Sequence, residues 1–224
     1  MTRASRHPFV HRWNHNAHYY PLIARQVPAD ARVVLDVGCG EGTLARYLAR
    51  PGRRVLGVDP DTAALATARA QGAAGTAGGT AAGAAGPGRD GAGSRGDVDL
   101  VAAGAEALPV ADRSVDALTM VMVLHHTDPT RALAEVRRVL RPGGVAVILG
   151  YGRSRSLLDG VAEARDAATH RWYSRRMQAW EPDVVAADPT LTWAETRHLL
   201  RAELPGSRSR RLPMWRYLCT WRAP

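Results

Sequence analysis

Lysine is absent from the sequence of 224 residues, so all 30 of its basic residues are arginine. Phenylalanine occurs once and isoleucine is rare, whereas alanine, glycine and arginine are abundant. This bias is typical of a gene rich in G and C, which makes the formal net charge of +9 weak evidence for a nucleic-acid partner. The arginines are also spread along the chain, whereas nucleic-acid binding requires basic side chains in clusters.

Cysteine and long apolar runs are scarce as well. The two cysteines, Cys39 and Cys219, are too few for a disulfide framework or a zinc site, and they favour a reducing compartment. No apolar run reaches the length of about 18 residues that a membrane-spanning helix needs. Residues 1–10 are polar and basic and lack the apolar core of a secretory signal. We therefore expect a cytoplasmic protein.

The length suits one α/β domain with a full core and is short for two. Within residues 31–150, short apolar runs that are typical of buried strands alternate with segments of helical spacing. This alternation predicts a doubly wound, mostly parallel, Rossmann-like sheet with right-handed crossovers. We expect strands over 32–37, 54–58, 98–102, 115–123 and 145–149, and helices over 43–50, 63–70 and from Asp128 to a turn at 141–144.

The N-terminal side of this core is expected to add a small cover. Residues 1–30 would form an arm, extended over 1–16, and a cap helix over 17–26. A tract over 72–96, dominated by glycine and alanine, cannot bury enough apolar surface to order itself. We interpret this tract as a flexible insertion between a helix and a strand of the core.

The C-terminal side, residues 151–224, is expected to cover the core and to close its sheet. A basic helix is predicted over 157–180, and a second helix over 193–203 with Thr192 as its cap. The chain then predicts an antiparallel hairpin that brings the sheet to seven strands, with its strands over 208–212 and 215–222.

A glycine-rich turn connects the first expected strand to the first helix, with Gly38, Gly40 and Gly42 at alternate positions. Glycine lets a backbone approach a ligand closely, and the helix that follows offers unpaired N–H groups. This spacing differs from the Gly-x-Gly-x-x-Gly of dinucleotide-binding folds. Asp36, just before the turn, would repel a pyrophosphate and suits a ligand with an ammonium group. Cys39 is expected to be a small buried filler rather than a nucleophile.

Asp59 ends the second expected strand, where an acid can accept hydrogen bonds from both hydroxyls of a ribose. The alternative is that Asp59 belongs to the turn Asp59-Pro60-Asp61, which caps the next helix. Asp61 can serve as that cap, which would leave Asp59 for the ligand. S-adenosylmethionine (SAM) has a ribose and an ammonium group and no phosphate, so it fits both acids.

These motifs together resemble the class I SAM-dependent methyltransferases, of the broad family often called methyltransferase type 11. The resemblance covers about residues 33–149, including Gly-Ala-Glu-Ala-Leu-Pro at 104–109 and Leu-His-His at 124–126. It departs from the family at Gly104, where an acid often bonds the adenine amino group. It implies SAM as the cofactor, no metal, and cofactor contacts from Asp36, Gly38, Cys39, Gly40, Asp59, Pro60, Ala105, Glu106, Met122 and Tyr20.

The resemblance also implies in-line transfer of the methyl group to an O, N, S or C nucleophile, with a general base only where the acceptor requires one. His126 and, less strongly, His125 are candidates for that base because they follow the fourth strand at the ligand-binding edge. The alternative is that one of them only bonds a loop. A cover over 151–224 would then face the methyl acceptor.

Aromatic side chains outside the core motifs allow two interpretations. Tyr19 or Tyr20 could face the sulfonium through a ring-cation contact, or both could pack on the sheet. The same choice, between an acceptor pocket and the core, applies to Trp172, Tyr173 and Trp180.

A small-molecule methyl acceptor is the leading expectation, because the sequence shows no recognisable RNA-binding appendage. Neither an Asn-Pro-Pro-Tyr motif for amino-group methylation nor a Pro-Cys pair for a cytosine adduct occurs. Three alternatives stay open: an RNA-directed methyltransferase, a nucleotide-binding oxidoreductase, and a SAM-binding protein without turnover.

Overall fold

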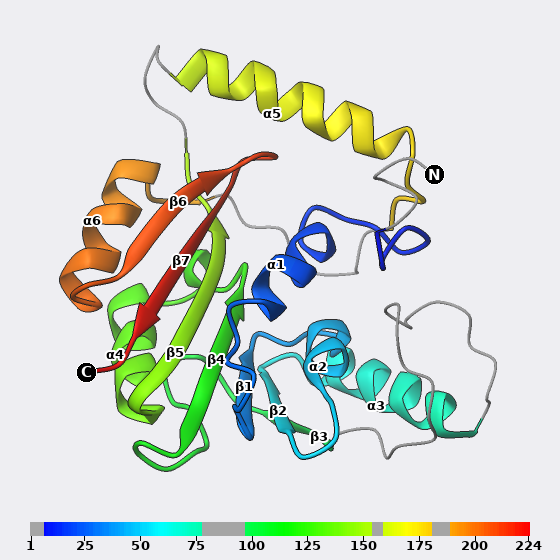
Figure 1. The fold of residues 1–224 in the computed structure, drawn as a ribbon, viewed down its shortest axis with the longest axis vertical. Helices are drawn as coiled ribbons and strands as arrows, with labels where there is room; N and C mark the ends of the chain where they lie inside the picture. The colour runs from blue at the N-terminus through cyan, green and yellow to red at the C-terminus, as the bar shows by residue number, and fades with distance from the viewer. Residues whose placement is uncertain (1–6, 78–96, 154–158, 181–188) are drawn as a thin grey trace.

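The structure is a computed structural model that describes residues 7–77, 97–153, 159–180 and 189–224. Its seven strands form one sheet in the order β3-β2-β1-β4-β5-β7-β6 (Figure 1). The first five strands are parallel, and β7 is antiparallel to both β5 and β6. The predicted fold is therefore confirmed, with strands β1 Val33–Val37, β2 Arg54–Asp59, β3 Val98–Ala102, β4 Val115–Val121, β5 Leu140–Tyr151, β6 Arg208–Leu212 and β7 Arg216–Arg222.

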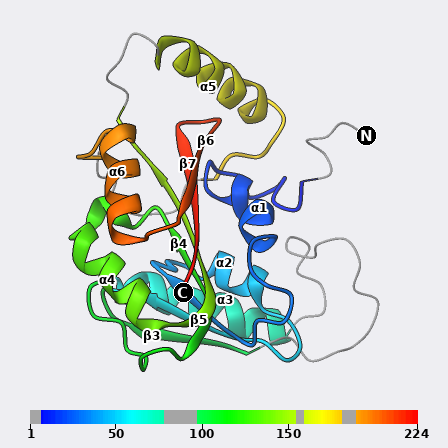
Figure 2. The same cartoon turned by 60° about the vertical axis from the view of Figure 1, so that its left-hand side comes forward.

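The central strands are apolar at consecutive positions because both faces of the sheet are covered. Leu35 and Val34, neighbours on β1, belong to two separate apolar clusters on opposite faces. One cluster takes its helical residues from α4 and α6, and the other from α1 and α2; Figure 2 shows the resulting layers. The helices of these layers are α1 Tyr20–Ala24, α2 Thr43–Leu48, α3 Thr62–Ala77, α4 Pro129–Val139 and α6 Trp193–Glu203.

Helix starts follow their predicted caps. Asp128 accepts hydrogen bonds from the backbone N–H groups of Thr130 and Arg131 at the start of α4. Thr192 and Glu195 form a reciprocal capping box at α6, which begins and ends where the sequence predicts. Each capping residue and the N–H groups that it binds lie within four residues of each other in the chain, so the sequence alone suffices to predict where these helices begin.

Several predicted boundaries in the core are wrong. Helix α2 ends at Leu48 rather than at Arg50. Helix α3 continues seven residues past Ala70, to Ala77, because the high helix propensity of alanine outweighs the low propensity of the glycines between them. Residues 78–96 of the predicted insertion lie outside the described part. Strand β4 ends at Val121 rather than 123. The predicted turn at 141–144 is an irregular start of β5, whose register jumps where residues 141–144 pass Asp116.

The N-terminal arm is compact rather than extended. Residues 7–16 form turns, and Trp13 is only 1% exposed. The Trp13 N–H donates to the Gln178 carbonyl over 3.0 Å, and the Trp180 N–H donates to the Trp13 carbonyl over 2.8 Å. The expected helix over 17–26 is a 3-10 turn, Ala17–Tyr19, followed by α1. The arm pairs with a segment more than 160 residues away in the chain. No local sequence pattern predicts such a contact.

Helix α5, Asp159–Ser174, lies across one end of the molecule, above α1 and the N-terminal segment (Figures 1 and 2). It is shorter than the predicted helix, whose first two residues lie outside the described part. Asp166 accepts from the Trp215 N–H over 3.1 Å and Glu163 from the Trp215 indole over 2.7 Å, so the helix docks on the turn between β6 and β7. That turn extends through Trp215, and β7 begins one residue later than predicted.

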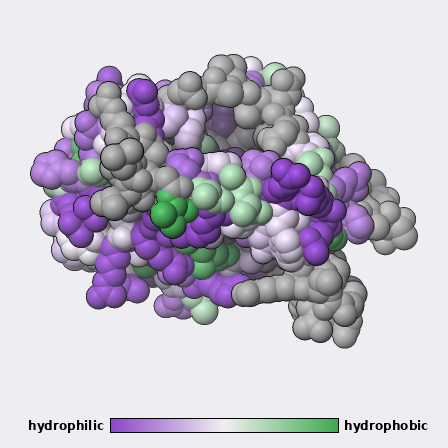
Figure 3. Space-filling model, turned by 90° about the horizontal axis from the view of Figure 1, so that it is seen from above, coloured by the Kyte–Doolittle hydropathy of each residue, from purple (hydrophilic) through white to green (hydrophobic). Residues whose placement is uncertain are grey.

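The outer face around α5, seen from above in Figure 3, mixes hydrophilic side chains with a small apolar area. Val161 and Trp172, both on α5, are the large apolar side chains exposed among the described residues. Within those same residues, no helix has the length and apolar character that a membrane crossing would require.

Candidate active site

The glycine turn after β1 has the backbone that its sequence predicts. Gly38, Gly40 and Gly42 have φ angles of 68°, 50° and 70°, in the left-handed region that favours glycine. The Gly38 N–H donates to the Val58 carbonyl over 2.7 Å, which ties the turn to β2. A Cβ on Gly38 would overlap the side chain of Val123, whereas a Cβ on Gly40 would meet no atom within 4 Å. The turn is thus packed on one side and open at Gly40.

Asp36 lies beneath this turn and is 2% exposed. One carboxylate oxygen, Oδ1, accepts a hydrogen bond from the Thr119 hydroxyl over 2.7 Å. The other, Oδ2, is buried and has no hydrogen-bond partner among the described residues. Burial raises the pKa of Asp36 to about 7, and the charge of nearby Asp59 adds to this rise, whereas the Thr119 hydroxyl and the Ala45 backbone N–H oppose it.

Both carboxylate oxygens of Asp59 already accept hydrogen bonds from the backbone, which the sequence does not predict. Its Oδ2 accepts from the Gly40 N–H over 2.8 Å, and its Oδ1 from the Asp61 N–H over 2.9 Å. Asp61 caps α3 as expected, since it accepts from the N–H groups of Ala63 and Ala64. Each oxygen of a carboxylate can accept a second hydrogen bond, so Asp59 retains the capacity to accept from hydroxyls. Pro60, which follows, is exposed.

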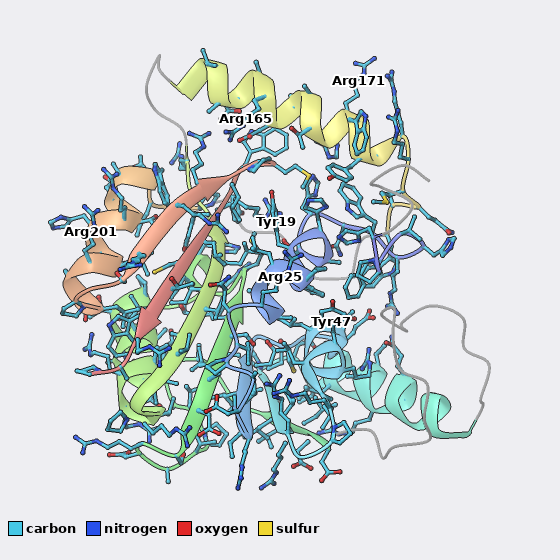
Figure 4. The ribbon with its side chains drawn as sticks, in the orientation of Figure 1. Tyr19, Arg25, Tyr47, Arg165, Arg171 and Arg201 are labelled. Carbon is cyan, nitrogen blue, oxygen red and sulfur yellow. The ribbon has the colours of Figure 1, made fainter. Side chains whose placement is uncertain are left out.

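The two adjacent tyrosines of the arm face different parts of the molecule. Tyr19, labelled in Figure 4, donates its hydroxyl to the Pro213 carbonyl over 2.6 Å and so packs against the β6–β7 turn. Tyr20 packs edge-on against Phe9, with ring centroids 5.3 Å apart. Burial raises the pKa of Tyr20, and the charge of Asp36 raises it further, so its hydroxyl lies within electrostatic reach of that carboxylate. Of the two, Tyr20 is the one on the side of the glycine turn.

The segment after β3 holds its predicted adenine-side residues in a turn. Ala105 is buried, and Glu106 is half-buried. The Glu106 carboxylate accepts from the Asp128 N–H over 2.7 Å, so it positions the start of α4. Gly104 leaves open space, because a Cβ there would meet no closer atom than a Glu106 oxygen at 3.8 Å.

Beyond β4 the backbone bends sharply at Met122, whose φ of 61° is unusual for a side chain of this size. Its N–H donates to the Leu149 carbonyl over 2.8 Å, which holds the bend against β5. The next residue, Val123, contacts Gly38, so this bend borders the glycine turn. Strained backbone of this kind is concentrated at functional sites.

The two histidines after this bend differ in their surroundings. His125 is half-buried and stands edge-on to Tyr151 at the end of β5, with ring centroids 4.6 Å apart. Burial lowers the pKa of His125 to about 4, and the charges of His126 and Arg216 lower it further. The ring is therefore neutral at pH 7. His126 is exposed, with its ring centroid 4.0 Å from that of His125.

Of the remaining predicted residues, Tyr173 and Trp180 contact the arm, Cys39 contacts the sheet, and Trp172 does neither. Tyr173 stacks on Trp13, with ring centroids 5.9 Å apart, and Trp180 lies under the Arg12 guanidinium at 3.9 Å. Trp172 is exposed on α5. Cys39 is buried, and its sulfur lies against Gly57 of β2, which agrees with the expected filler.

The comparisons with known proteins agree with this geometry. A family model described as "Methyltransferase domain" matches residues 35–148. A protein of Mycobacterium tuberculosis, named as an uncharacterized methyltransferase, is 33% identical over 214 residues and covers 95% of this chain and 98% of its own. The chain belongs to this methyltransferase family. The cofactor that goes with this membership is SAM.

Solved structures share the fold of this methyltransferase at low sequence identity. A SAM-dependent methyltransferase from Methanosarcina mazei has a TM-score of 0.59 at 21% identity, over 91% of this chain and 97% of its own. The [4+2]-cyclase SpnF has a TM-score of 0.63 at 17% identity, over 95% and 83%. Because one shared fold supports different chemistries, the acceptor has to be argued from the side chains.

Sequence reasoning missed two groups of residues in the methyltransferase. Arg12 forms an ion pair with Glu41 of the glycine turn over 2.5 Å, which ties the arm to that turn. Arg216, at the start of β7, donates to the Asn16 side-chain oxygen over 3.1 Å, although the two residues are 200 positions apart. Neither contact has a signal in the local sequence.

Proposed function

We propose that this methyltransferase transfers the methyl group of SAM to an O, N, S or C nucleophile of a small molecule. The unpartnered Oδ2 of Asp36 carries the proposal, because a carboxylate that is buried without a partner costs stability unless a ligand satisfies it. The ammonium group of SAM would do so. The acid lies directly before a glycine turn that is open at Gly40.

SAM would lie at this end of the sheet. Asp36 would hold the ammonium group, and Gly38, Cys39 and Gly40 would offer backbone along the ligand. Asp59 and Pro60, at the end of β2, would face the ribose, with Ala105 and Glu106 at the adenine and Met122 at the edge of β4. These roles would use the capacity of Asp59 to accept further hydrogen bonds.

SAM, when bound, supplies a methyl group that its sulfonium already activates. The protein then has to orient the acceptor and exclude water, which is where the arm, α1 and Tyr20 would act. His125 is neutral at pH 7 and can accept a hydrogen bond or a proton from an acceptor, although its low pKa makes it a weak base. His126 is the exposed alternative.

A small acceptor is favoured over RNA by what covers the edge of the sheet. The arm packs on the segment after α5, and α5 docks on the β6–β7 turn, so both cover the end where the acceptor would bind. We interpret residues 1–30 as the cofactor cover and residues 151–224 as the acceptor cover of one domain.

Calorimetric titration with S-adenosylhomocysteine (SAH) tests the cofactor site. We expect Asp36→Asn and Asp59→Asn each to weaken binding about tenfold or more, as expected for the loss of a charged hydrogen-bond partner. Asp30→Asn, which removes the same charge from an exposed position, is the matched control and should bind like the parent. Equal affinity in all four proteins would refute the assignment.

Binding and transfer assays on the same protein distinguish the other candidate functions. Stabilisation by NADH but not by SAH would indicate an oxidoreductase. Binding of RNA that falls steeply with salt would indicate an RNA-directed enzyme. SAH binding without transfer from methyl-labelled SAM to any acceptor in a small-molecule screen would indicate a protein without turnover.

A further inference from the structure

Histidine rings gather where the N-terminal arm meets helix α5. Four of the eight histidines of the chain form this cluster: His7, His15 and His18 of the arm and His170 of α5. The His15 and His170 rings stack with centroids 4.6 Å apart, and His18 stands edge-on to Tyr173 of α5 at 4.4 Å. All four rings are half-buried. The contact between arm and helix is therefore built largely from groups that can take up a proton.

The hydrogen bonds of His7 and His18 require both rings to be neutral. Nδ1 of His7 accepts from the Phe9 N–H over 3.2 Å, and Nδ1 of His18 accepts from the Trp13 indole over 3.3 Å. Nε2 of His7 donates to the His18 carbonyl over 3.0 Å. A protonated ring has two N–H donors and no acceptor. A proton on either Nδ1 would therefore face another donor, and the hydrogen bond there would be lost.

The rings of His15 and His170 bond the arm directly to α5, with Nε2 of His15 2.8 Å from Nδ1 of His170. One of these nitrogens has to donate and the other has to accept. The pair can take up one proton and keep its hydrogen bond, because a protonated ring can donate to a neutral one. A second proton places two N–H groups against each other, so full protonation breaks the bond between arm and helix.

The charged surroundings also favour neutral rings. Burial is the main cause that lowers the pKa of His15 and of His18 to about 4. Arg216 and His170 add to this effect at His15, and His7 and His15 add to it at His18. The two acids on the inner side of α5, Glu163 and Asp166, both accept from Trp215. The other titratable or charged groups around the cluster are Tyr19 of the arm, Arg165 and Tyr173 of α5, and Arg211 of β6.

We propose that the arm and α5 form a proton-sensitive latch, which is closed while the four histidines are neutral and opens as His15 and His18 take up protons. An arm released from α5 exposes both rings to water, where a histidine titrates near pH 6.5. Protons therefore favour the open state as pH falls from about 6.5 towards 4, and the latch is closed above that range. In the proposed function this contact closes the acceptor side of the sheet edge, and only that consequence rests on the proposed function.

Hydrogen exchange on the whole protein tests the latch, with rates expressed as protection factors so that the intrinsic effect of pH is removed. The reporting groups are the backbone N–H groups of Trp13 and Trp180, which bond the arm to the segment after α5. We expect their protection to fall about tenfold or more from pH 7 to pH 5, after allowing for solvent screening of half-buried rings. The N–H groups of β1 and β4 should keep their protection, because the opening is local.

Two variants remove the protons while keeping a polar side chain. His15→Gln and His18→Gln should each reduce the pH-dependent fall in protection, and the double variant should remove most of it. His198→Gln, at an exposed histidine of α6, is the matched control and should behave like the parent. Nitrogen NMR adds a readout of the closed state: at pH 7 the rings of His7 and His18 should both carry their proton on Nε2, because Nδ1 accepts in each.

Three results would overturn the latch. They are protection at Trp13 that does not change with pH, an equal loss of protection in β1 and β4, and a double variant that responds to pH like His198→Gln. A proton on Nδ1 of His18 at pH 7 would contradict the closed state. SAH affinity, measured at pH 7 for every variant, separates this inference from the proposed function. Failure of the parent to bind SAH would refute the proposed function and leave the latch, whereas any of the three results with normal SAH binding would refute the latch alone.

Discussion

The two ends of the sheet edge that carries the glycine turn show opposite pKa shifts. At the ends of β1 and β2, Asp36 is buried and its pKa is raised to about 7. At the ends of β4 and β5, Arg216 stands beside His125, whose pKa is lowered to about 4.

The two ends also differ in how they are built. The glycine turn and its acid come from one short segment, in which Asp36 is two residues before Gly38. The other end combines the arm, β5 and β7, and Asn16 and Arg216 meet only in the folded chain. We therefore expect the glycine turn to be destabilised by small substitutions within its own segment. The other end should be destabilised by substitutions in the arm, because the arm holds its side chains together.

The largest effect is expected at the glycine turn. Gly38→Ala should destabilise the protein by about 3 kcal/mol or more, because a left-handed alanine is strained and its Cβ overlaps Val123. Gly40→Ala, with a similar φ and open space, is the matched control and should cost only about 1 kcal/mol. Urea unfolding measures both, and equal losses would contradict the packing of Gly38.

Asp36 should give the next largest effect, and in the stabilising direction. Its pKa is about 7 in the folded protein against an ordinary 3.8, so the stability of the parent without ligand should fall as pH rises from about 4 to 7. Asp36→Asn removes the buried charge and should stabilise the protein at pH 8 by on the order of 2 kcal/mol. Thermal unfolding at pH 4 and pH 8 measures this, and a loss of stability at pH 8 would contradict it.

The histidines of the cover should show the opposite pH dependence. Burial lowers the pKa of both His15 and His18 to about 4, so the unfolded chain takes up protons first as pH falls from 6.5. Stability should therefore fall between pH 6.5 and 4, by about 1 kcal/mol for each half-buried ring after allowing for solvent screening. His18→Gln should make this decline shallower in urea unfolding, while the exposed His11→Gln should not. An unchanged decline in His18→Gln would contradict the assignment.

The smallest effect is expected where the arm contacts the glycine turn. The ion pair between Arg12 and Glu41 is partly exposed, so Arg12→Gln should cost less than about 1 kcal/mol. Hydrogen exchange at the Trp13 N–H should nevertheless accelerate, because the arm loses a tie to the turn. Arg25→Gln, at an exposed arginine of the cap helix, is the control. Equal exchange in both variants would show that Arg12 does not hold the arm.

Much of the fold and of the acidic end could be predicted because their signals are short. Apolar runs placed β1 to β4 within two residues, and Asp61 and Thr192 cap the helices that their positions predict. The backbone of Gly38, Gly40 and Gly42 follows from residue type, since their φ angles are positive.

The basic end could not be predicted because its contacts join distant segments. Trp13 pairs with the chain at Ala179, and Arg216 meets Asn16 across 200 positions. The hydrogen bond from Gly40 to Asp59 is likewise a contact between distant segments, the turn after β1 and the end of β2, and the spacing that assigns Asp59 to the ribose does not predict it. Spacing alone does not show which side chains meet across the sheet.

The pairing of Asp36 with an ammonium group is most directly tested by comparing SAH with an analogue that lacks only the amino group. In calorimetric titrations at pH 8, we expect the parent to bind SAH about tenfold or more tightly than the analogue. Asp36→Asn should lose most of that preference. If Asp36→Asn prefers SAH over the analogue as strongly as the parent does, the ammonium group does not bind this acid.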